Sequence, residues 1–155
     1  MKILFLHGLE SSPESTKVSF LRQLGHSVYA PSLGRWSFEE SALIAQAAFD
    51  GYKPDVVVGS SRGGALAMQL EAAGSNMILI APAWQKYEVP PAVPKSAKLL
   101  HSVDDDVVPL QHSVMLSLTL DTGALRVVGD SHRMSDKTAL EALARAISEV
   151  DDHEG

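Results

Sequence analysis

One short stretch constrains the fold of this chain more than any other. The apolar, β-branched run Val56–Val58 leads directly into Gly59-Ser60-Ser61-Arg62-Gly63, and the alanine-rich segment Ala65–Ala73 that follows is typical of a helix. A Gly-x-Ser-x-Gly motif between a strand and a helix is typical of a sharp turn with an exposed serine hydroxyl. Such a turn needs small flanking residues, which the two glycines of the motif supply. We therefore expect Ser61 at the tip of the turn, beside the free N–H groups of a helix N-terminus.

Strand-like and helix-like segments alternate along the rest of the chain. Short apolar runs predict six strands, at Lys2–Leu6, Val28–Tyr29, Asp55–Val58, Met77–Ile80, Lys98–Ser102 and Leu125–Val128. Helical patterns and capping residues predict helices between them, at Pro13–Leu24 after Ser12, from Ser37 to about Phe49, at Ala65–Ala73, from about Pro109 to Leu120, and after Ser135. Strands that are apolar throughout and alternate with helices indicate a parallel sheet covered on both faces. The predicted fold is therefore α/β, a three-layer α/β/α sandwich around a mainly parallel six-stranded sheet.

Length, charge and composition narrow the class of protein. The 155 residues are enough for one domain, predicted to span 1–155, with a core of its own. The formal net charge of −6 disfavours nucleic acid as a partner. The chain has no cysteine, and we find neither a signal peptide nor an apolar run long enough to span a membrane. We expect a cytoplasmic monomer or homodimer that does not bind membranes.

Several polar residues follow the predicted strands. In a parallel α/β sheet, ligands bind beyond the carboxyl ends of the strands, and His7, Ser61, Asp104–Asp106 and His132 each come shortly after a predicted strand. A serine becomes a nucleophile when a base takes its proton, a histidine suits that task near neutral pH, and a carboxylate orients the histidine. The chain order serine, aspartate, histidine is the one that accompanies this type of turn in hydrolases.

Other interpretations of these residues stay open at this point. The run Asp104–Asp106 also fits a solvated turn or a site for a hard cation. Asp130 is a rival acid, although it lies too near His132 in the chain for the usual geometry. His7, Asp105 and His132 resemble a set of metal ligands, but a metal site would leave the serine turn without a purpose. We therefore predict no metal and no cofactor.

The motifs resemble those of the α/β-hydrolase superfamily, in particular its small members without a cap domain. The run Leu6-His7-Gly8-Leu9-Glu10-Ser11-Ser12-Pro13 and the turn Gly59–Gly64 are similar to small bacterial esterases of the YqiA (UPF0227) type. The resemblance covers nearly the whole chain and implies a minimal α/β-hydrolase fold. The site residues that it implies are Ser61 as nucleophile, Asp105 as acid and His132 as base, with the backbone N–H groups of Leu9 and Arg62 as the oxyanion hole.

Two residues depart from the pattern of this family. The family pattern His-Gly-x-x-Asp-x-Val-Val-Pro lies over His101–Pro109, and Ser102 stands at its glycine, which leaves the path of the acid loop open. Arg62 stands where the family more often has an apolar side chain or glutamine. We interpret its charge either as a contact for a negatively charged substrate or as a partner for Asp104 or Asp106.

The segment between the fourth and fifth predicted strands bears on the substrate. It runs from Ala81 to Pro94, and it is too short and too rich in proline for a cap domain. We therefore expect an open, wet cleft that suits small esters. The predicted substrate-binding residues are His7, Ser11, Trp36, Trp84, Tyr87 and Met134. In the pattern of this family His7 more often holds the oxyanion loop than contacts substrate, and Ser11 is most simply a helix-capping residue. The aromatic residues and Met134 also fit ordinary packing.

These patterns predict a serine hydrolase that cleaves small or short-chain carboxylic esters through an acyl-enzyme. Its partner is then a small-molecule ester. A thioesterase with the same three residues is a close alternative, and peptide or lactone hydrolysis also fits them. A non-catalytic binding protein on the same fold is the alternative from another class, although the chain has lost none of the three residues.

Overall fold

Six parallel strands form one sheet in the computed structural model, which describes residues 1–9, 11–72, 74–121 and 123–154. The strands are β1 (Lys2–Leu6), β2 (Ser27–Tyr29), β3 (Val56–Ser60), β4 (Asn76–Ile80), β5 (Lys98–His101) and β6 (Leu125–Val127). Their order across the sheet is β2-β1-β3-β4-β5-β6, and each neighbouring pair is parallel. The predicted parallel sheet is confirmed.

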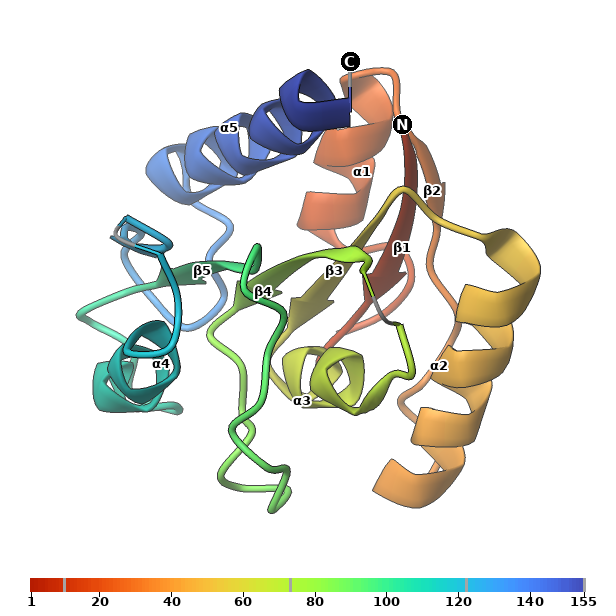
Figure 1. The fold of residues 1–155 in the computed structure, drawn as a ribbon, viewed down its shortest axis with the longest axis horizontal. Helices are drawn as coiled ribbons and strands as arrows, with labels where there is room; N and C mark the ends of the chain where they lie inside the picture. The colour runs from red at the N-terminus through yellow and green to blue at the C-terminus, as the bar shows by residue number, and fades with distance from the viewer. Residues whose placement is uncertain (10, 73, 122, 155) are drawn as a thin grey trace.

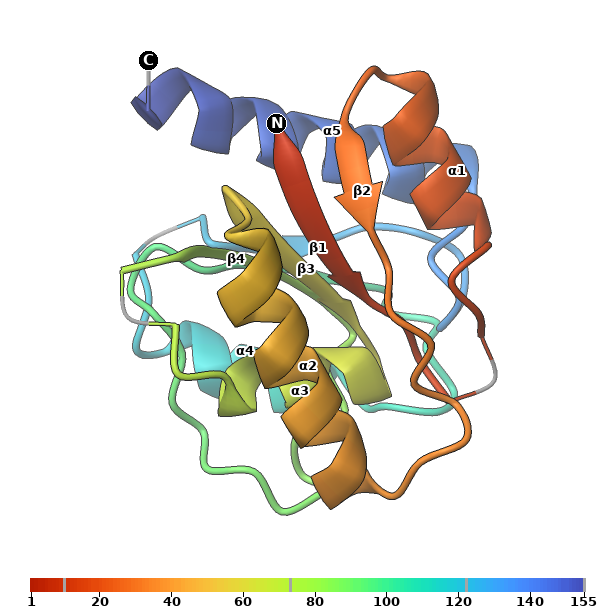
Figure 2. The same ribbon diagram turned by 90° about the vertical axis from the view of Figure 1, so that its right-hand side faces the viewer.

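Five helices in the described part of the chain cover the two faces of the sheet (Figure 1 and Figure 2). Helices α1 (Thr16–Gln23) and α5 (Lys137–Glu154) lie on one face. Helices α2 (Phe38–Tyr52), α3 (Arg62–Gln69) and α4 (Leu110–Ser117) lie on the other. The arrangement is the predicted three-layer sandwich, with helices above and below a single sheet.

Packing on both faces explains why the strands are apolar throughout. Ile3 and Phe5 of β1 belong to the core cluster that includes α1 and α5, whereas Leu4 and Leu6 belong to the cluster that includes α2, α3 and α4. Successive side chains of a strand point to opposite faces of its sheet. A strand that is covered on both faces therefore needs an apolar residue at every position, and β3 is accordingly buried along its whole length.

The predicted helix starts are only partly correct. Ser37 caps α2 as predicted, and its hydroxyl accepts a backbone N–H at 3.1 Å. Ser15 caps α1, because the hydroxyl of Ser12 is already bound to a backbone N–H in the turn that precedes the helix. At α5 the carboxylate of Asp136, and not Ser135, accepts the N–H of the first turn. Competing local hydrogen bonds therefore decide where these two helices begin.

The segment between β4 and β5 forms no additional layer over the carboxyl edge of the sheet. Residues 81–97, all of which the structure describes, form turns and bends without a helix or strand. This agrees with the prediction that the stretch is too short and proline-rich for a cap. None of the helices in the described part of the chain has the length and hydropathy needed to cross a membrane.

Candidate active site

Ser61 lies between the end of β3 and the start of α3, in a strained backbone conformation. Its φ of 56° and ψ of −116° fall outside the regions that a non-glycine residue normally adopts. Hydrogen bonds hold this conformation: the Ser61 N–H donates to the carbonyl of Ile80 at 2.9 Å, and its carbonyl accepts the N–H of Ala83 at 3.0 Å. The turn of the motif is therefore anchored to the chain that follows β4.

The close approach of α3 to the sheet explains the glycines of the motif. A Cβ atom added at Gly63 would lie 1.9 Å from the carbonyl oxygen of Leu6, and one added at Gly59 would lie 2.5 Å from the carbonyl oxygen of Gly63. Both distances are far below van der Waals contact. The expectation that these positions must be small is confirmed: α3 packs against β1 at Gly63, and its first turn packs against the end of β3 at Gly59.

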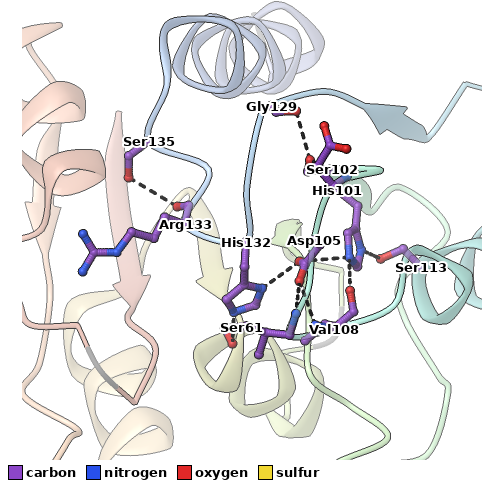
Figure 3. Close-up of polar contacts among 12 residues, drawn as sticks. Ser61, His101, Ser102, Asp105, Val108, Ser113, Gly129, His132, Arg133 and Ser135 are labelled. Carbon is purple, nitrogen blue, oxygen red and sulfur yellow. Dashed lines mark hydrogen bonds and ion pairs between the residues drawn. The ribbon is translucent and has the colours of Figure 1, made fainter.

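Ser61, His132 and Asp105 form one hydrogen-bonded line (Figure 3). The Nε2 atom of His132 lies 2.8 Å from the Ser61 hydroxyl oxygen, and its Nδ1 atom lies 2.7 Å from a carboxylate oxygen of Asp105. Because the carboxylate can only accept, Nδ1 carries the proton, which leaves Nε2 free to accept the serine proton. The three residues come from the ends of β3, β5 and β6, which the parallel sheet brings to one edge.

Asp105 is the aspartate that binds His132, and its carboxylate is fully buried. Its second oxygen accepts the backbone N–H groups of Val107 and Val108 at 2.8 and 2.7 Å. These bonds orient the carboxylate toward the histidine. The rival Asp130 is exposed, and its backbone N–H binds the carboxylate of Asp136 instead.

Two buried polar residues, His101 and Ser102, support the loop that carries Asp105, and no such role was predicted for either. His101 Nε2 lies 2.9 Å from the carbonyl of Val108 and 3.2 Å from the carboxylate of Asp105, and its Nδ1 lies 2.7 Å from the Ser113 hydroxyl. Burial lowers the pKa of His101, which favours the neutral ring. Ser102 donates to the carbonyl of Gly129 at 2.9 Å, so it ties the acid loop to the loop that carries His132. The sequence feature that could have indicated this role is the pair of polar residues, His101 and Ser102, directly at the end of β5.

The expected oxyanion-hole residues, Leu9 and Arg62, both line a cavity that also contains Ser61 and His132. Arg62 is the first residue of α3, so its backbone N–H has no partner within the helix. His7 braces the Leu9 loop: its Nδ1 lies 2.8 Å from the carbonyl of Gly8, and its Nε2 accepts the N–H of Leu33 at 3.0 Å. Burial lowers the pKa of His7, and the neighbouring Arg62 charge adds to the effect.

The cavity has a volume of about 650 Å³. Of the six residues predicted to bind substrate, Ser11 and Tyr87 line it. Tyr87 stacks on Phe38 with ring centroids 4.7 Å apart, so its ring is held in place. The remaining lining comes mainly from the loop after β1, the first turn of α1, and the loops after β4, β5 and β6.

The other four predicted substrate contacts lie elsewhere in the fold. His7 is buried behind the loop after β1, Met134 belongs to the core beneath α5, and Trp84 is buried with its indole N–H bound to the carbonyl of His112. Trp36 is 45% exposed and is outside the described cavity lining. Position in the chain and side-chain type did not distinguish packing residues from cavity residues, because that distinction depends on contacts between distant segments.

The contacts of Arg62 contradict both interpretations of its charge. Its guanidinium is buried and donates to the carbonyls of Leu33 and Trp36 and to the hydroxyl of Ser41, at 3.3, 2.8 and 3.2 Å. It forms no ion pair with Asp104 or Asp106, both of which the structure describes. The side chain ties the start of α3 to the connection between β2 and α2.

Comparisons with known proteins agree with this fold. The model of the alpha/beta hydrolase family matches residues 3–151. Alpha/beta hydrolase domain-containing protein 10 from mouse superposes with a TM-score of 0.75 at 18% identity, over 99% of this chain and 90% of that chain. Est1E from Butyrivibrio proteoclasticus gives 0.67 at 16% identity, over 96% and 85% of the two chains. The esterase domain of a Rhodothermus marinus protein gives 0.63 at 16% identity, over 96% and 84%. No curated protein sequence gives a significant match.

Proposed function

The chain belongs to the alpha/beta hydrolase family, and from that premise we propose that it is a serine carboxylesterase that cleaves small or short-chain esters. The observation that carries the proposal is the line of hydrogen bonds from Ser61 through His132 to the buried carboxylate of Asp105. A strained serine whose hydroxyl lies within hydrogen-bond reach of a histidine, which a buried carboxylate orients in turn, supports nucleophilic catalysis.

In the first half-reaction, the Ser61 oxygen attacks the ester carbonyl carbon while His132 Nε2 takes the hydroxyl proton. The Asp105 carboxylate stabilises the imidazolium through its bond with Nδ1–H. The carbonyl oxygen becomes an oxyanion, which the N–H groups of Leu9 and Arg62 stabilise. The carbon–oxygen bond to the alcohol then breaks, and His132 gives its proton to the departing oxygen.

Water completes the cycle in the second half-reaction. His132 takes a proton from a water molecule, whose oxygen attacks the carbonyl carbon of the acyl-enzyme. The bond between this carbon and the Ser61 oxygen breaks, and His132 returns the proton to the serine. The products are the carboxylic acid and the free enzyme, so no cofactor is consumed.

The choice of small esters rests on the shape of the site. The cavity of about 650 Å³ holds a small ester, and the turns between β4 and β5 add no layer that could enclose a long acyl chain. We extend the proposal to the specificity of small YqiA-type esterases, with thioesters as the alternative substrate class. A cytoplasmic location and a monomeric or dimeric state stay predictions from the sequence.

Hydrolysis of p-nitrophenyl esters from acetate upward tests the proposal. We expect wild-type turnover to fall as the acyl chain lengthens, and Ser61→Ala to lower kcat by at least about a thousandfold. Asp105→Asn should lower kcat by about a hundredfold or more, because the asparagine no longer holds the required histidine tautomer. Asp104→Asn is the matched control, since the exposed neighbour makes no bond with His132, and it should stay within about twofold of wild type.

A fluorophosphonate label gives a second readout that does not depend on the choice of ester. Ser61 should be labelled in the wild-type protein and not in Ser61→Ala. Absence of both ester turnover and labelling would favour the non-catalytic binding protein. Faster turnover of a thioester than of its matched oxygen ester would favour the thioesterase.

A further inference from the structure

Lys17 is a buried lysine that the proposed reaction does not use. Only 7% of its surface is exposed, and it lies in the first turn of α1 and lines the catalytic cavity. Its ammonium group donates to the backbone carbonyl of Arg133 at 2.5 Å. An ammonium has three donors, and no carboxylate of the described residues forms an ion pair with it.

A second cation lies beside this lysine. Arg133 follows His132 in the chain and lines the same cavity, and its guanidinium forms no ion pair within the described residues. In Figure 3 its side chain extends to the side of His132 that is opposite Asp105. Burial lowers the pKa of Lys17 to about 8, and repulsion by the Arg133 charge adds to the effect.

The surroundings of this pair are polar but contain little negative charge. Five hydroxyl residues from the same two segments line the cavity, namely Ser11, Ser12, Ser15, Thr16 and Ser135. Glu14 is the carboxylate among the described lining residues, and its side chain is 81% exposed and pairs with Arg22 at 3.8 Å. The lining that comes from the loops after β4 and β5 is more apolar, with Ala83, Tyr87, Val107 and Val108.

We propose that Lys17 and Arg133 form an anion-binding subsite, and that the substrate carries a carboxylate or phosphate group that they bind. A bound anion relieves three unfavourable interactions together: the burial of an unpaired ammonium, its repulsion by Arg133, and its position at the positive end of α1. Because both residues line the cavity that also contains Ser61 and His132, the anionic group binds in the same cavity as the ester that Ser61 attacks. The inference rests on the proposed function, since it places the anion on the ester substrate.

Matched esters that differ in one anionic group test the subsite. Leaving-group charge is tested with 4-acetoxybenzoate and 4-acetoxyphenyl phosphate against neutral 4-acetoxybenzamide, and acyl-side charge with mono-p-nitrophenyl adipate against p-nitrophenyl hexanoate. We expect kcat/KM of wild type to favour the anionic ester by about tenfold or more in at least one comparison, as for a charge-assisted hydrogen bond. The larger of the carboxylate and phosphate ratios identifies the group.

Variants show whether the two cations cause the preference. The ratio of anionic to neutral kcat/KM should fall to near one in Arg133→Gln and in Lys17→Met, and Arg133→Lys should retain most of it. Lys86→Gln, which removes another positive charge from the cavity lining, is the matched control and should change the ratio less than about twofold. Variants that slow the charged and neutral esters equally would show a merely structural role and overturn the proposal.

Failure of this inference can be told apart from failure of the proposed function. Turnover of neutral esters without any preference for anionic ones overturns the subsite alone. If no ester is hydrolysed, the subsite can still be tested by calorimetry, in which 4-acetoxybenzoate is titrated into the Ser61→Ala variant. Binding that is lost when Arg133→Gln is added to this variant supports the subsite. Absence of binding, or binding that survives the added change, overturns it.

Discussion

The guanidinium of Arg62 is buried, and it donates hydrogen bonds to three neutral oxygens. Two of its three acceptors, the carbonyl of Leu33 and the hydroxyl of Ser41, are themselves buried and bonded to each other at 3.3 Å. The rings of Phe38 and Tyr87 lie 5.8 Å from its central carbon. The side chain therefore stabilises the start of α3, which includes the backbone N–H of the proposed oxyanion hole.

Removing these donors should affect stability and leave substrate charge preference alone. Arg62→Met keeps the aliphatic volume but removes three hydrogen bonds of a charged, buried donor, and we expect the free energy of unfolding in urea to fall by about 2 kcal/mol. The ratio of anionic to neutral ester turnover should not change. Arg35→Met, at an exposed position nearby, is the control and should stay within about 0.5 kcal/mol of wild type. A lowered ester ratio in Arg62→Met would show that its guanidinium does contact substrate.

Among the helices and strands, the contact between β1 and α3 decides where Ser61, the proposed nucleophile, lies. A Cβ at Gly63 would meet the carbonyl oxygens of Leu6 and His7 at 1.9 and 2.8 Å, so the helix reaches the strand closely enough to exclude a methyl group. The backbone of β1 is fixed between β2 and β3 and cannot move away without breaking the sheet. The small residues of the motif thus set the distance between two elements as well as the shape of the turn.

Two glycine-to-alanine substitutions distinguish the effect of this close contact on stability from the effect of ordinary helix propensity. Gly63→Ala should lower the free energy of unfolding by about 3 kcal/mol or more, because β1 and α3 must separate. Gly51 lies in α2 with no atom within 4 Å of an added Cβ, so Gly51→Ala should raise it by about 0.5–1 kcal/mol. Urea unfolding measures both. Similar values for the two variants would contradict the steric explanation.

The secondary structure shows what local patterns predict well. The six strands lie within two residues of their predicted ends, since a buried strand between polar loops is visible as an apolar run. The start of α1 was predicted three residues too early, at Pro13 instead of Thr16. A helix start depends on which of several nearby hydroxyls binds the free N–H groups, and Ser12 and Ser15 are equivalent on composition alone.

In the molecule as a whole, the cavity lining and the protein differ in the sign of their charge. The formal net charge is −6, yet the described lining contains Lys17, Lys86 and Arg133 against the single carboxylate of Glu14. Exposed charges more than about 10 Å apart are largely screened at moderate salt. The local cations therefore dominate at the site, and the buried one among them affects the stability of the entire fold.

The burial of Lys17 should appear as a pH dependence of stability. Its pKa falls from 10.5 to about 8 on folding, which corresponds to a loss of about 3 kcal/mol at neutral pH, where the charge is buried in full. From pH 8 to 10.5 the folded state binds fewer protons than the unfolded state, so this loss shrinks as the pH rises. Lys17→Met, which also loses the bond to Arg133, should therefore raise the free energy of unfolding at pH 7 by about 2 kcal/mol.

Urea unfolding of Lys17→Met and wild type at pH 7 and pH 9.5 measures this effect. The stability advantage of the variant should be smaller at pH 9.5. An advantage that is independent of pH, or a variant that is less stable than wild type at pH 7, would contradict the assigned cause. A side chain that lowers stability in the free protein and binds an anion of the substrate is the trade-off expected at a functional site.

The parallel α/β architecture, the glycine-flanked serine turn and the order in which serine, aspartate and histidine follow their strands can all be predicted from the sequence. These features are local, because each depends on a short run of residues whose hydrophobic period or side-chain size is typical of one structure. Tertiary structure decided that Asp105 and not its neighbours binds His132, that Arg62 turns away from the site, and that Lys17 and Arg133 meet. Those contacts join segments up to 116 residues apart, and their geometry depends on how the whole sheet and its helices pack.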